Sequence, residues 1–167
     1  MLKNLMSKLV AITIGDIEGI GIKLLIDLWK KNKINNFILF TNFKIFKQYN
    51  LISNKNINII SNEDKLINYN KRKFNIYNYY TKNKYTNVLD SLNQVYKLTK
   101  RNYFMGIVTL PLTKKDINEK VSRDFIDQTS FFSKLEKRKD SNMIFIYKNK
   151  FFVPLTIHIE LKNVYKQ

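Results

Sequence analysis

The architecture of this 167-residue chain is set by the stretch Ala11-Ile12-Thr13-Ile14-Gly15-Asp16-Ile17-Glu18-Gly19-Ile20-Gly21. The apolar run from Leu9 to Ile14 is typical of a buried strand, and it ends at a glycine and an aspartate. The residues from Ile20 to Lys31 follow a helical pattern that is apolar nearly all round, which predicts a well-buried helix. In α/β proteins, ligands bind where such a strand ends, so the turn from Gly15 to Gly21 is a candidate site. The turn matches neither GxGxxG nor the Walker A pattern, and on its own it favours a structural role, with glycines where φ is positive.

The alternation of strands and helices continues through the rest of the chain. Residues 61–85 are rich in Asn, Lys and Tyr, and they predict a loop with one irregular edge strand around 74–80. Without a Pro/Gly/Ser-rich linker or an internal repeat, residues 1–167 are expected to form a single truncated α/β unit. The fold class is predicted to be α/β with a mainly parallel sheet flanked by helices. Further strands are predicted at 37–40, 57–60, 105–110, 143–147 and 151–159, and further helices at 43–49, 86–102, 114–120 and 129–137.

Two later segments repeat the transition from an apolar strand to polar residues. The first runs from Gly106 to Lys114 and is closed by Pro111. The second runs from Leu155 to Val164 and holds His158, the only histidine of the chain. Thr156, His158 and Glu160 alternate with apolar residues there, so they would share one face of a strand. That polar face fits either a binding site or contact with solvent.

The net charge of +17 invites a nucleic-acid interpretation. Two features weigh against it. The 30 basic residues are almost all lysines, with arginine only at positions 72, 101, 123 and 138, whereas base and phosphate readout favours arginine. The lysines also accompany an excess of Asn, Ile, Phe and Tyr, all of which share A/T-rich codons, and they form no single stripe. We expect only non-specific attraction to nucleic acid at low salt.

The composition also indicates the cellular compartment in which the protein is expected. The absence of cysteine excludes disulfides and thiolate metal sites. The N-terminal apolar run is too short for a signal peptide, and no stretch approaches the length of a membrane span. We expect a cytoplasmic protein without a membrane partner.

Taken together, the segments resemble the 4-hydroxythreonine-4-phosphate dehydrogenase family of vitamin B6 (pyridoxal phosphate) biosynthesis. That family has Gly-Asp-Pro-x-Gly-Ile-Gly after its first strand, Val-Thr-Gly-Pro-x-x-Lys in the middle, then Gly-His-Thr-Glu, a Met-rich strand and Thr-x-His-x-Pro-Leu-x-x-Val. The resemblance spans nearly the whole chain, is weakest from about residue 42 to 85, and covers the N-terminal half of the family's usual length. The matching pieces, in the same order, are Gly15 to Gly21, Val108 to Lys114, Asp127-Gln128-Thr129-Ser130, Asn142-Met143-Ile144 and Thr156 to Val164.

The resemblance implies a concrete activity and fold. The fold would be the first half of the isocitrate/isopropylmalate dehydrogenase-like subunit, which forms a homodimer. The enzyme would be an NAD- or NADP-dependent dehydrogenase that oxidises 4-phosphooxy-threonine, a small phosphorylated amino acid, with loss of carbon dioxide. A divalent metal (zinc, magnesium or cobalt) held by three histidines would polarise the substrate oxygen. By position, His158 matches a metal ligand, Thr129 a substrate-binding threonine, and Gln128 a substrate-contacting histidine.

The departures from the family pattern bear on activity. Ile17 replaces a proline, Leu110 a glycine, Gln128 a histidine and Glu160 a proline. The other two metal histidines, most cofactor-binding loops and most phosphate-binding residues belong to the second half of the family's subunit, so no catalytic or cofactor-binding residue is assigned here. A chain with one histidine cannot build a three-histidine site, and in a symmetric dimer each histidine lies in its own copy of the site.

These departures leave three functional interpretations. The chain is an impaired or partner-dependent dehydrogenase, completed by a second copy or by a separately encoded C-terminal half. Alternatively, it is a non-catalytic remnant or one subunit of a split enzyme. The third interpretation is a basic nucleic-acid-binding protein. Thr129 also fits an ordinary helix N-cap, and most lysines, Lys114 among them, fit a solvated surface.

Overall fold

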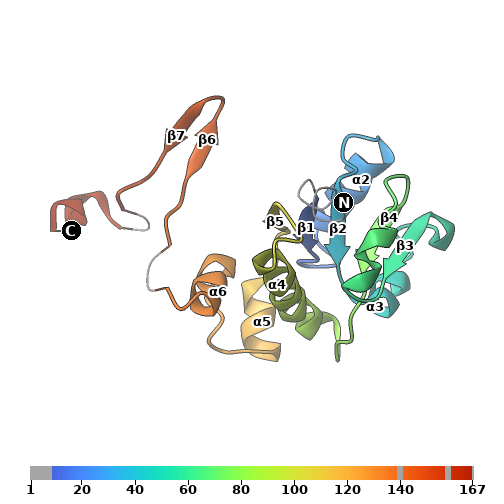
Figure 1. Cartoon of the computed structure of the whole chain (residues 1–167). Coiled ribbons are helices and arrows are strands. Elements are labelled where there is room, and N and C mark those ends of the chain that lie inside the picture. Colours follow the sequence, from blue (N-terminus) through green and yellow to red (C-terminus); the bar gives the residue numbers. More distant parts are fainter. Residues whose placement is uncertain (1–8, 139–140, 157–158, 167) are drawn as a thin grey trace. The chain divides into compact units, whose positions relative to one another are not determined.

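A computed structural model describes residues 9–138, 141–156 and 159–166 of the chain. The chain divides into two compact units, and the boundary along the sequence lies between Gln128 and Thr129. The first unit contains a five-stranded sheet with its helices, and the second contains a two-stranded hairpin (Figure 1).

The sheet of the first unit is entirely parallel. Its strands lie in the order β3-β4-β2-β1-β5, so β1 is central and has β2 on one side and β5 on the other. Val10 of β1 lies opposite both Phe37 of β2 and Gly106 of β5. The predicted α/β fold with a parallel sheet flanked by helices is confirmed. The strands are β1 (Val10–Thr13), β2 (Phe37–Phe40), β3 (Ile57–Ile60), β4 (Phe74–Tyr77) and β5 (Gly106–Thr109).

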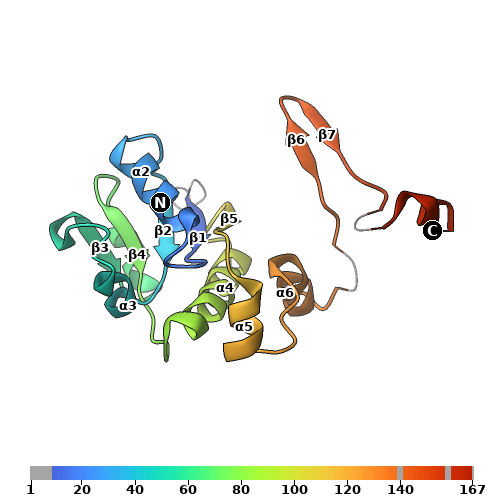
Figure 2. The same ribbon diagram turned by 180° about the vertical axis from the view of Figure 1, so that it is seen from behind.

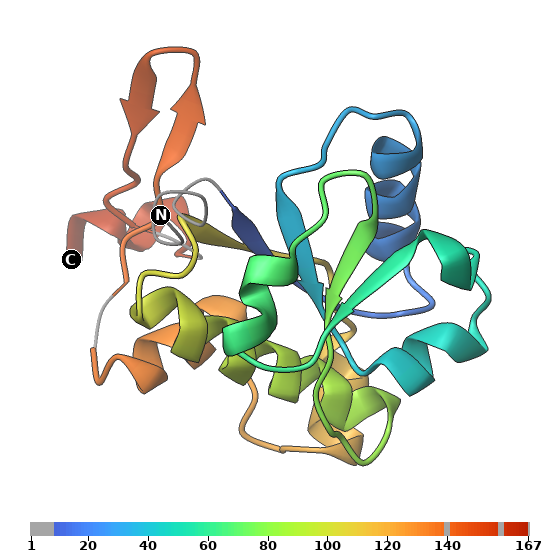
Figure 3. The same cartoon turned by 45° about the vertical axis from the view of Figure 1, so that its right-hand side comes forward.

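Helices cover both faces of this sheet, as side-chain alternation along buried strands requires. On one face, α2 (Ile20–Lys30) and α3 (Phe43–Gln48) pack into an apolar cluster with strand residues such as Ile12 and Phe74. The other face is covered by α4 (Lys84–Lys100) (Figure 3). Ser91 of α4 donates a hydrogen bond of 3.0 Å to the Phe40 carbonyl. The unit also contains α5 (Lys114–Lys120) and two short 3₁₀ helices, Asn54–Asn56 and Asp64–Asn68.

One strand differs from the sequence prediction. Residues 74–80 were expected to give an irregular edge strand, but β4 is regular, lies between β3 and β2, and is buried at all four positions. The polar Asn75 is tolerated there because its side chain is fully hydrogen-bonded. Its amide oxygen accepts from Asn58 at 2.8 Å and from the Asn70 backbone at 2.9 Å, and its amide group donates to the carbonyls of Asn70 and Lys73.

A second difference concerns α2. Its apolar pattern predicted burial nearly all round, and Ile22, Leu25 and Ile26 are buried as expected. Ile20 and Leu24, on another side of the helix, are exposed. The helix therefore covers the sheet with one apolar face and presents a second apolar face that the described residues leave uncovered.

A buried polar network fixes the ends of β2 and β4. The Tyr79 hydroxyl donates to the side-chain oxygen of Asn87 at 2.9 Å, and that oxygen also accepts from the Asn42 backbone at 3.0 Å. The Asn87 amide group donates to Thr41 at 2.9 Å. Burial raises the pKa of the Tyr79 phenol well above its usual value. The neutral phenol is therefore the form that the folded protein holds.

The second unit begins within α6 (Gln128–Leu135), followed by the hairpin of β6 (Phe145–Tyr147) and β7 (Lys150–Phe152) and a 3₁₀ helix, Leu161–Lys166 (Figure 2). The two strands pair antiparallel, with Phe145 opposite Phe152. The predicted final strand, 151–159, is wrong over 153–156, which are not in a strand. Pro154 supplies no backbone N–H for a strand ladder there. His158 lies outside the described residues.

None of the helices in the described ranges is long and apolar enough to cross a membrane.

Replacing Phe74 with alanine tests the interior position of β4. The Phe74 ring is completely buried and contacts the rings of Trp29, Phe37 and Phe46. We expect Phe74→Ala to lower the free energy of unfolding by about 3–5 kcal/mol in urea titrations, because it leaves a cavity among these rings. Tyr80→Ala is the control, since Tyr80 is 86% exposed. Equal effects of the two substitutions would contradict the interior placement.

The alkaline pH dependence of stability tests the Tyr79 network. The unfolded chain ionises Tyr79 near pH 10.0, whereas the raised pKa delays ionisation in the folded protein. This stability is fully present below pH 10.0 and is lost as the pH rises towards the folded pKa. In that window the free energy of unfolding should fall by up to about 1.4 kcal/mol per pH unit more in the wild type than in Tyr79→Phe. Parallel profiles in urea titrations would show that burial of Tyr79 is not linked to folding.

Candidate functional site at the carboxyl ends of β1 and β5

The candidate site lies at the point where the chain changes direction across the sheet. From β1 the chain passes through α2 to β2 on one side, and later it returns through α4 to β5 on the other side of β1. The loops that follow β1 and β5 therefore leave in opposite directions. In open α/β sheets this divergence creates the crevice in which ligands bind.

Two of the three sequence segments meet in this crevice. The Asp16 backbone N–H donates to the Pro111 carbonyl at 2.8 Å, and the Thr113 hydroxyl donates to the Asp16 carboxylate at 3.2 Å. The Leu110 backbone N–H donates to the Thr13 hydroxyl at 3.3 Å. The loop after β1 and the loop after β5 thus form one hydrogen-bonded structure.

Gly15 is required by this contact. Its φ is +59°, and a Cβ atom placed on it would lie 2.4 Å from the Pro111 carbonyl oxygen. Only glycine combines that backbone conformation with such a close approach. The structural interpretation of this glycine is therefore correct, and the same turn also shapes the site.

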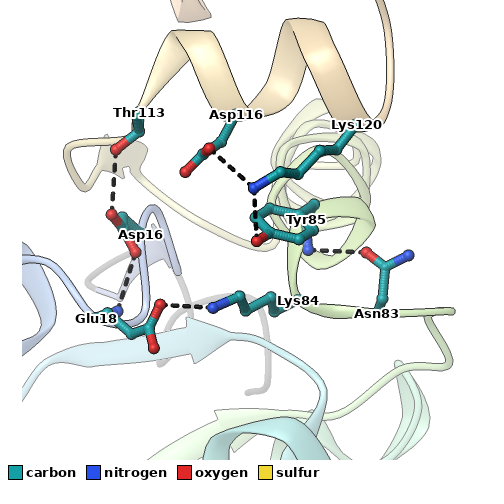
Figure 4. Close-up of polar contacts among 8 residues, drawn as sticks. All are labelled: Asp16, Glu18, Asn83, Lys84, Tyr85, Thr113, Asp116 and Lys120. Carbon is teal, nitrogen blue, oxygen red and sulfur yellow. Dashed lines mark hydrogen bonds and ion pairs between the residues drawn. The ribbon is translucent and has the colours of Figure 1, made fainter.

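A cluster of charged side chains borders the crevice (Figure 4). The Lys84 ammonium group lies 2.6 Å from the Glu18 carboxylate. The Lys120 ammonium group donates to the Tyr85 hydroxyl at 2.8 Å and to the Asp116 carboxylate at 3.1 Å. The cluster therefore joins the loop after β1, the start of α4 and α5.

Both lysines of the cluster remain cationic. The hydrogen bond to Glu18 raises the pKa of Lys84, and the hydrogen bonds to Tyr85 and Asp116 raise the pKa of Lys120. Each ammonium group is already paired with an acidic side chain. These side chains are partly exposed to solvent, so the ion pairs contribute little to stability and the ammonium groups can exchange partners.

The cavity itself is small, with a volume of about 60 Å³ between Gly15–Glu18, the start of α4 and α5. This volume holds a few water molecules. It accepts a small group or the end of a larger ligand, and it is too small for a whole dinucleotide.

The sequence did not reveal Lys84 and Tyr85 as site residues, because they were assigned to a loop. The helix α4 begins two residues earlier than predicted, at Lys84. Asn83 caps it by accepting from the backbone of Tyr85 and Thr86, and the Thr86 hydroxyl accepts from the Asn83 backbone. This reciprocal capping pattern, Asn-x-x-Thr, was the signal that would have placed both residues at a helix start.

The predicted site residues are distributed differently from this cluster. Gln128 is the first residue of α6, and its side-chain amide donates to the Leu110 carbonyl at 2.9 Å. Thr129 is exposed and lies within the first turn of α6 rather than at its N-cap. Lys114 is exposed and does not line the cavity. The structure joins Gln128 to the loop after β5, whereas His158 lies outside the described residues.

A divalent metal does not fit the described residues by themselves. Over residues 9–138, 141–156 and 159–166, no group of three or more His, Cys, Asp or Glu side chains is arranged to hold an ion. Even with His158, the sequence offers only one imidazole. A three-histidine site therefore requires ligands from outside this chain.

The family model for the pyridoxal phosphate biosynthetic protein PdxA matches residues 33–167, which is most of the chain. The chain belongs to the PdxA family. Among curated proteins none matches its sequence significantly. The match to the family model confirms the family resemblance that the sequence motifs indicated.

Solved structures show the same fold. A putative 4-hydroxythreonine-4-phosphate dehydrogenase from Salmonella typhimurium matches with a TM-score of 0.77 and 17% identity, over 93% of this chain and 53% of that one. The 4-hydroxythreonine-4-phosphate dehydrogenase from Klebsiella pneumoniae matches with a TM-score of 0.75 and 16% identity, over 94% of this chain and 53% of that one. The 4-hydroxythreonine-4-phosphate dehydrogenase from Burkholderia phymatum matches with a TM-score of 0.75 and 14% identity, over 93% of this chain and 52% of that one. The chain therefore spans about half the length of these structures.

Gly15→Ala tests the contact between the two loops. The substitution forces a left-handed conformation on alanine, at a cost of about 1–2 kcal/mol, and adds a clash with the Pro111 carbonyl. We expect the free energy of unfolding to fall by at least that amount in chemical denaturation.

Gly106→Ala is the matched control, since a Cβ atom there meets nothing within 4 Å. Alanine at this strand position should be neutral or slightly stabilising. If Gly15→Ala were as stable as Gly106→Ala, the close approach of the loops would be contradicted.

Proposed function

We propose that this chain provides half of the active site of a 4-hydroxythreonine-4-phosphate dehydrogenase. The complete enzyme would use NAD or NADP to oxidise the secondary alcohol of 4-phosphooxy-threonine in vitamin B6 biosynthesis, and the resulting β-keto acid would lose carbon dioxide. The observation that carries this proposal is the match of residues 33–167 to the PdxA family model. The meeting of Gly15–Gly21 and Leu110–Lys114 at the switch point of the sheet supports it.

Within the proposed enzyme, three residues of this chain have roles by family resemblance. Gln128 and Thr129 would contact the substrate, and His158 would be one ligand of a divalent zinc, magnesium or cobalt ion that acts as a Lewis acid. The remaining ligands and most of the cofactor site would come from the second half of the family subunit, whether on a separate chain or in a longer assembly. A homodimer of such complete units is the expected assembly, in the cytoplasm.

A specific observation favours a second candidate, a non-catalytic subunit. Gln128 stands where the family has a histidine, and its amide group is committed to the Leu110 carbonyl. A glutamine held in this way cannot exchange protons with a substrate as an imidazole does. Under this alternative, the chain keeps the fold and an interaction surface, and catalysis is lost.

Reduction of NAD or NADP by the purified chain distinguishes the two candidates. The assay contains 4-phosphooxy-threonine and zinc or magnesium, with and without a polypeptide that comprises the part of the Salmonella typhimurium protein not covered by this chain. We expect turnover only in the mixture, because one histidine cannot complete the metal site.

His158→Ala is the control for the metal role, and in the mixture it should reduce turnover at least about tenfold. Turnover that is unaffected by this substitution would remove His158 from the site. A mixture that forms a stable complex and shows no turnover would favour the non-catalytic subunit.

A further inference from the structure

A second cavity lies at the carboxyl ends of β2 and β4, beside the crevice described above. Its volume is about 610 Å³, an order of magnitude larger than the cavity at the ends of β1 and β5. Residues from the loop after β2, from α3 and from the loop between β4 and α4 line it. Small-molecule sites in proteins have volumes of about 300–1,000 Å³, so this cavity is large enough for an organic ligand.

Hydrogen bonds between the two loops hold this cavity in shape. The Asn42 side-chain amide donates to the Tyr79 carbonyl at 2.6 Å, and the Phe43 backbone N–H donates to the Asn78 side-chain oxygen at 2.8 Å. The Asn42 backbone N–H also donates to the Asn87 side chain at 3.0 Å, which joins the loop after β2 to α4. The cavity is therefore part of the fold and does not need a ligand to form it.

The charge around this cavity is positive and unbalanced. Lys44 of α3 and Lys82 of the loop after β4 line it, and neither ammonium group forms an ion pair with a residue that the structure describes. Lys84 also lines it and is paired with Glu18. None of the described lining residues is acidic, whereas acidic side chains border the cavity at the ends of β1 and β5. This second cavity is therefore complementary to an anion.

Aromatic rings line the same cavity, and they belong to Phe43, Tyr49, Tyr79 and Tyr80. Tyr80 is 86% exposed, and Phe43 and Tyr49 are half-buried, so ring surface remains open to a ligand. A nucleobase stacks on such a ring, and the phosphates on either side of the base bind to lysines nearby. A simple aliphatic anion would use the lysines only, and a neutral aromatic molecule would use the rings only.

We propose that this cavity binds single-stranded nucleic acid, with one base stacked on Tyr80 and the neighbouring phosphates bound by Lys44 and Lys82. A strand fits better than a free nucleotide, because the net charge of +17 attracts a polyanion along its length. A duplex fits poorly, because its base faces are already stacked on one another. This function goes beyond the dehydrogenase activity proposed above and does not rest on it.

The fold supplies what the sequence did not show. Along the chain the lysines form no single stripe, so charge alone predicted only non-specific attraction to nucleic acid. The structure brings Lys44 and Lys82, from separate segments, to one cavity that also holds the aromatic rings. Non-specific attraction depends on charge and not on rings, so the loss of one ring distinguishes a site from a charged surface.

Fluorescence anisotropy with a labelled single-stranded oligouridylate of about 10 nucleotides tests the proposal on the full chain. At physiological salt, Tyr80→Ala should weaken binding at least about fivefold, because the stacking of one base is lost. The same substitution should leave the salt dependence of binding unchanged, since it removes no charge. Tyr80→Phe is the matched control, and it should bind like the wild type because the ring is kept.

Substitution of Lys44 and Lys82 together by alanine tests the phosphate contacts. The slope of log affinity against log salt concentration should decrease by about 1.4, at about 0.7 for each phosphate contact on a single strand. Lys23 and Lys31, substituted together by alanine, are the charge-matched control, because both are exposed at α2 and neither lines the cavity. This control pair should change the slope by less than half as much.

Thermal melting verifies that each variant is folded. Absence of saturable binding would overturn the proposal, as would unchanged binding by Tyr80→Ala or equal effects of the two lysine pairs. Equal affinity for a duplex of the same length would also overturn it, as would complete competition by polyglutamate at equal charge concentration, because polyglutamate has charge without bases. Full displacement of the oligouridylate by AMP at the same nucleotide concentration would assign the cavity to a free nucleotide instead.

Discussion

The contact on which this structure depends is the approach of the Gly15 backbone to the Pro111 carbonyl. β1 and β5 are adjacent strands that the chain reaches nearly a hundred residues apart, and their loops diverge after the sheet ends. The hydrogen bond from Asp16 to Pro111 joins these loops at the point of divergence, and only a glycine at position 15 allows it. The placement of Asp16, Thr113 and α5 around the cavity follows from this junction. Gly15 therefore has a structural role, and it shapes the site because it allows the two loops to meet there.

The sequence predicted best the strands whose own residues form a continuous apolar run. β1 and β2 are short apolar runs that are almost entirely buried, so local pattern and tertiary environment agree, whereas β5 lies at the sheet edge and is only partly buried. β4 was misplaced because Asn75 interrupts its pattern, and an unpaired asparagine would be costly inside a sheet. Its partners, Asn58 and the Asn70–Lys73 turn, are recruited from the stretch that the sequence assigned to loop. Hydrogen bonds between residues far from a strand's own pattern are not visible in that pattern.

The candidate site was predictable in its position and less so in its members. The switch point follows from two strands that end in glycine- and proline-containing turns, and those turns stand out in the sequence. Lys84 and Lys120 do not stand out among 30 basic residues, because their role depends on Glu18, Tyr85 and Asp116 as partners. Pairing of this kind is a property of the folded chain. Gln128 was identified through the family pattern, and its bond to Leu110, another departure from that pattern, became visible only in the structure.

The error about α2 is informative in a different way. The sequence predicted burial on all sides, and the described residues cover one side only. Exposed aliphatic residues at single positions are common, but a stripe of three along a helix, facing an open strand edge, lowers solubility without stabilising this unit. The helical periodicity of α2 therefore predicted its element type and its core-facing residues, whereas the exposure of Ile20 and Leu24 depends on which neighbours the fold places beside them.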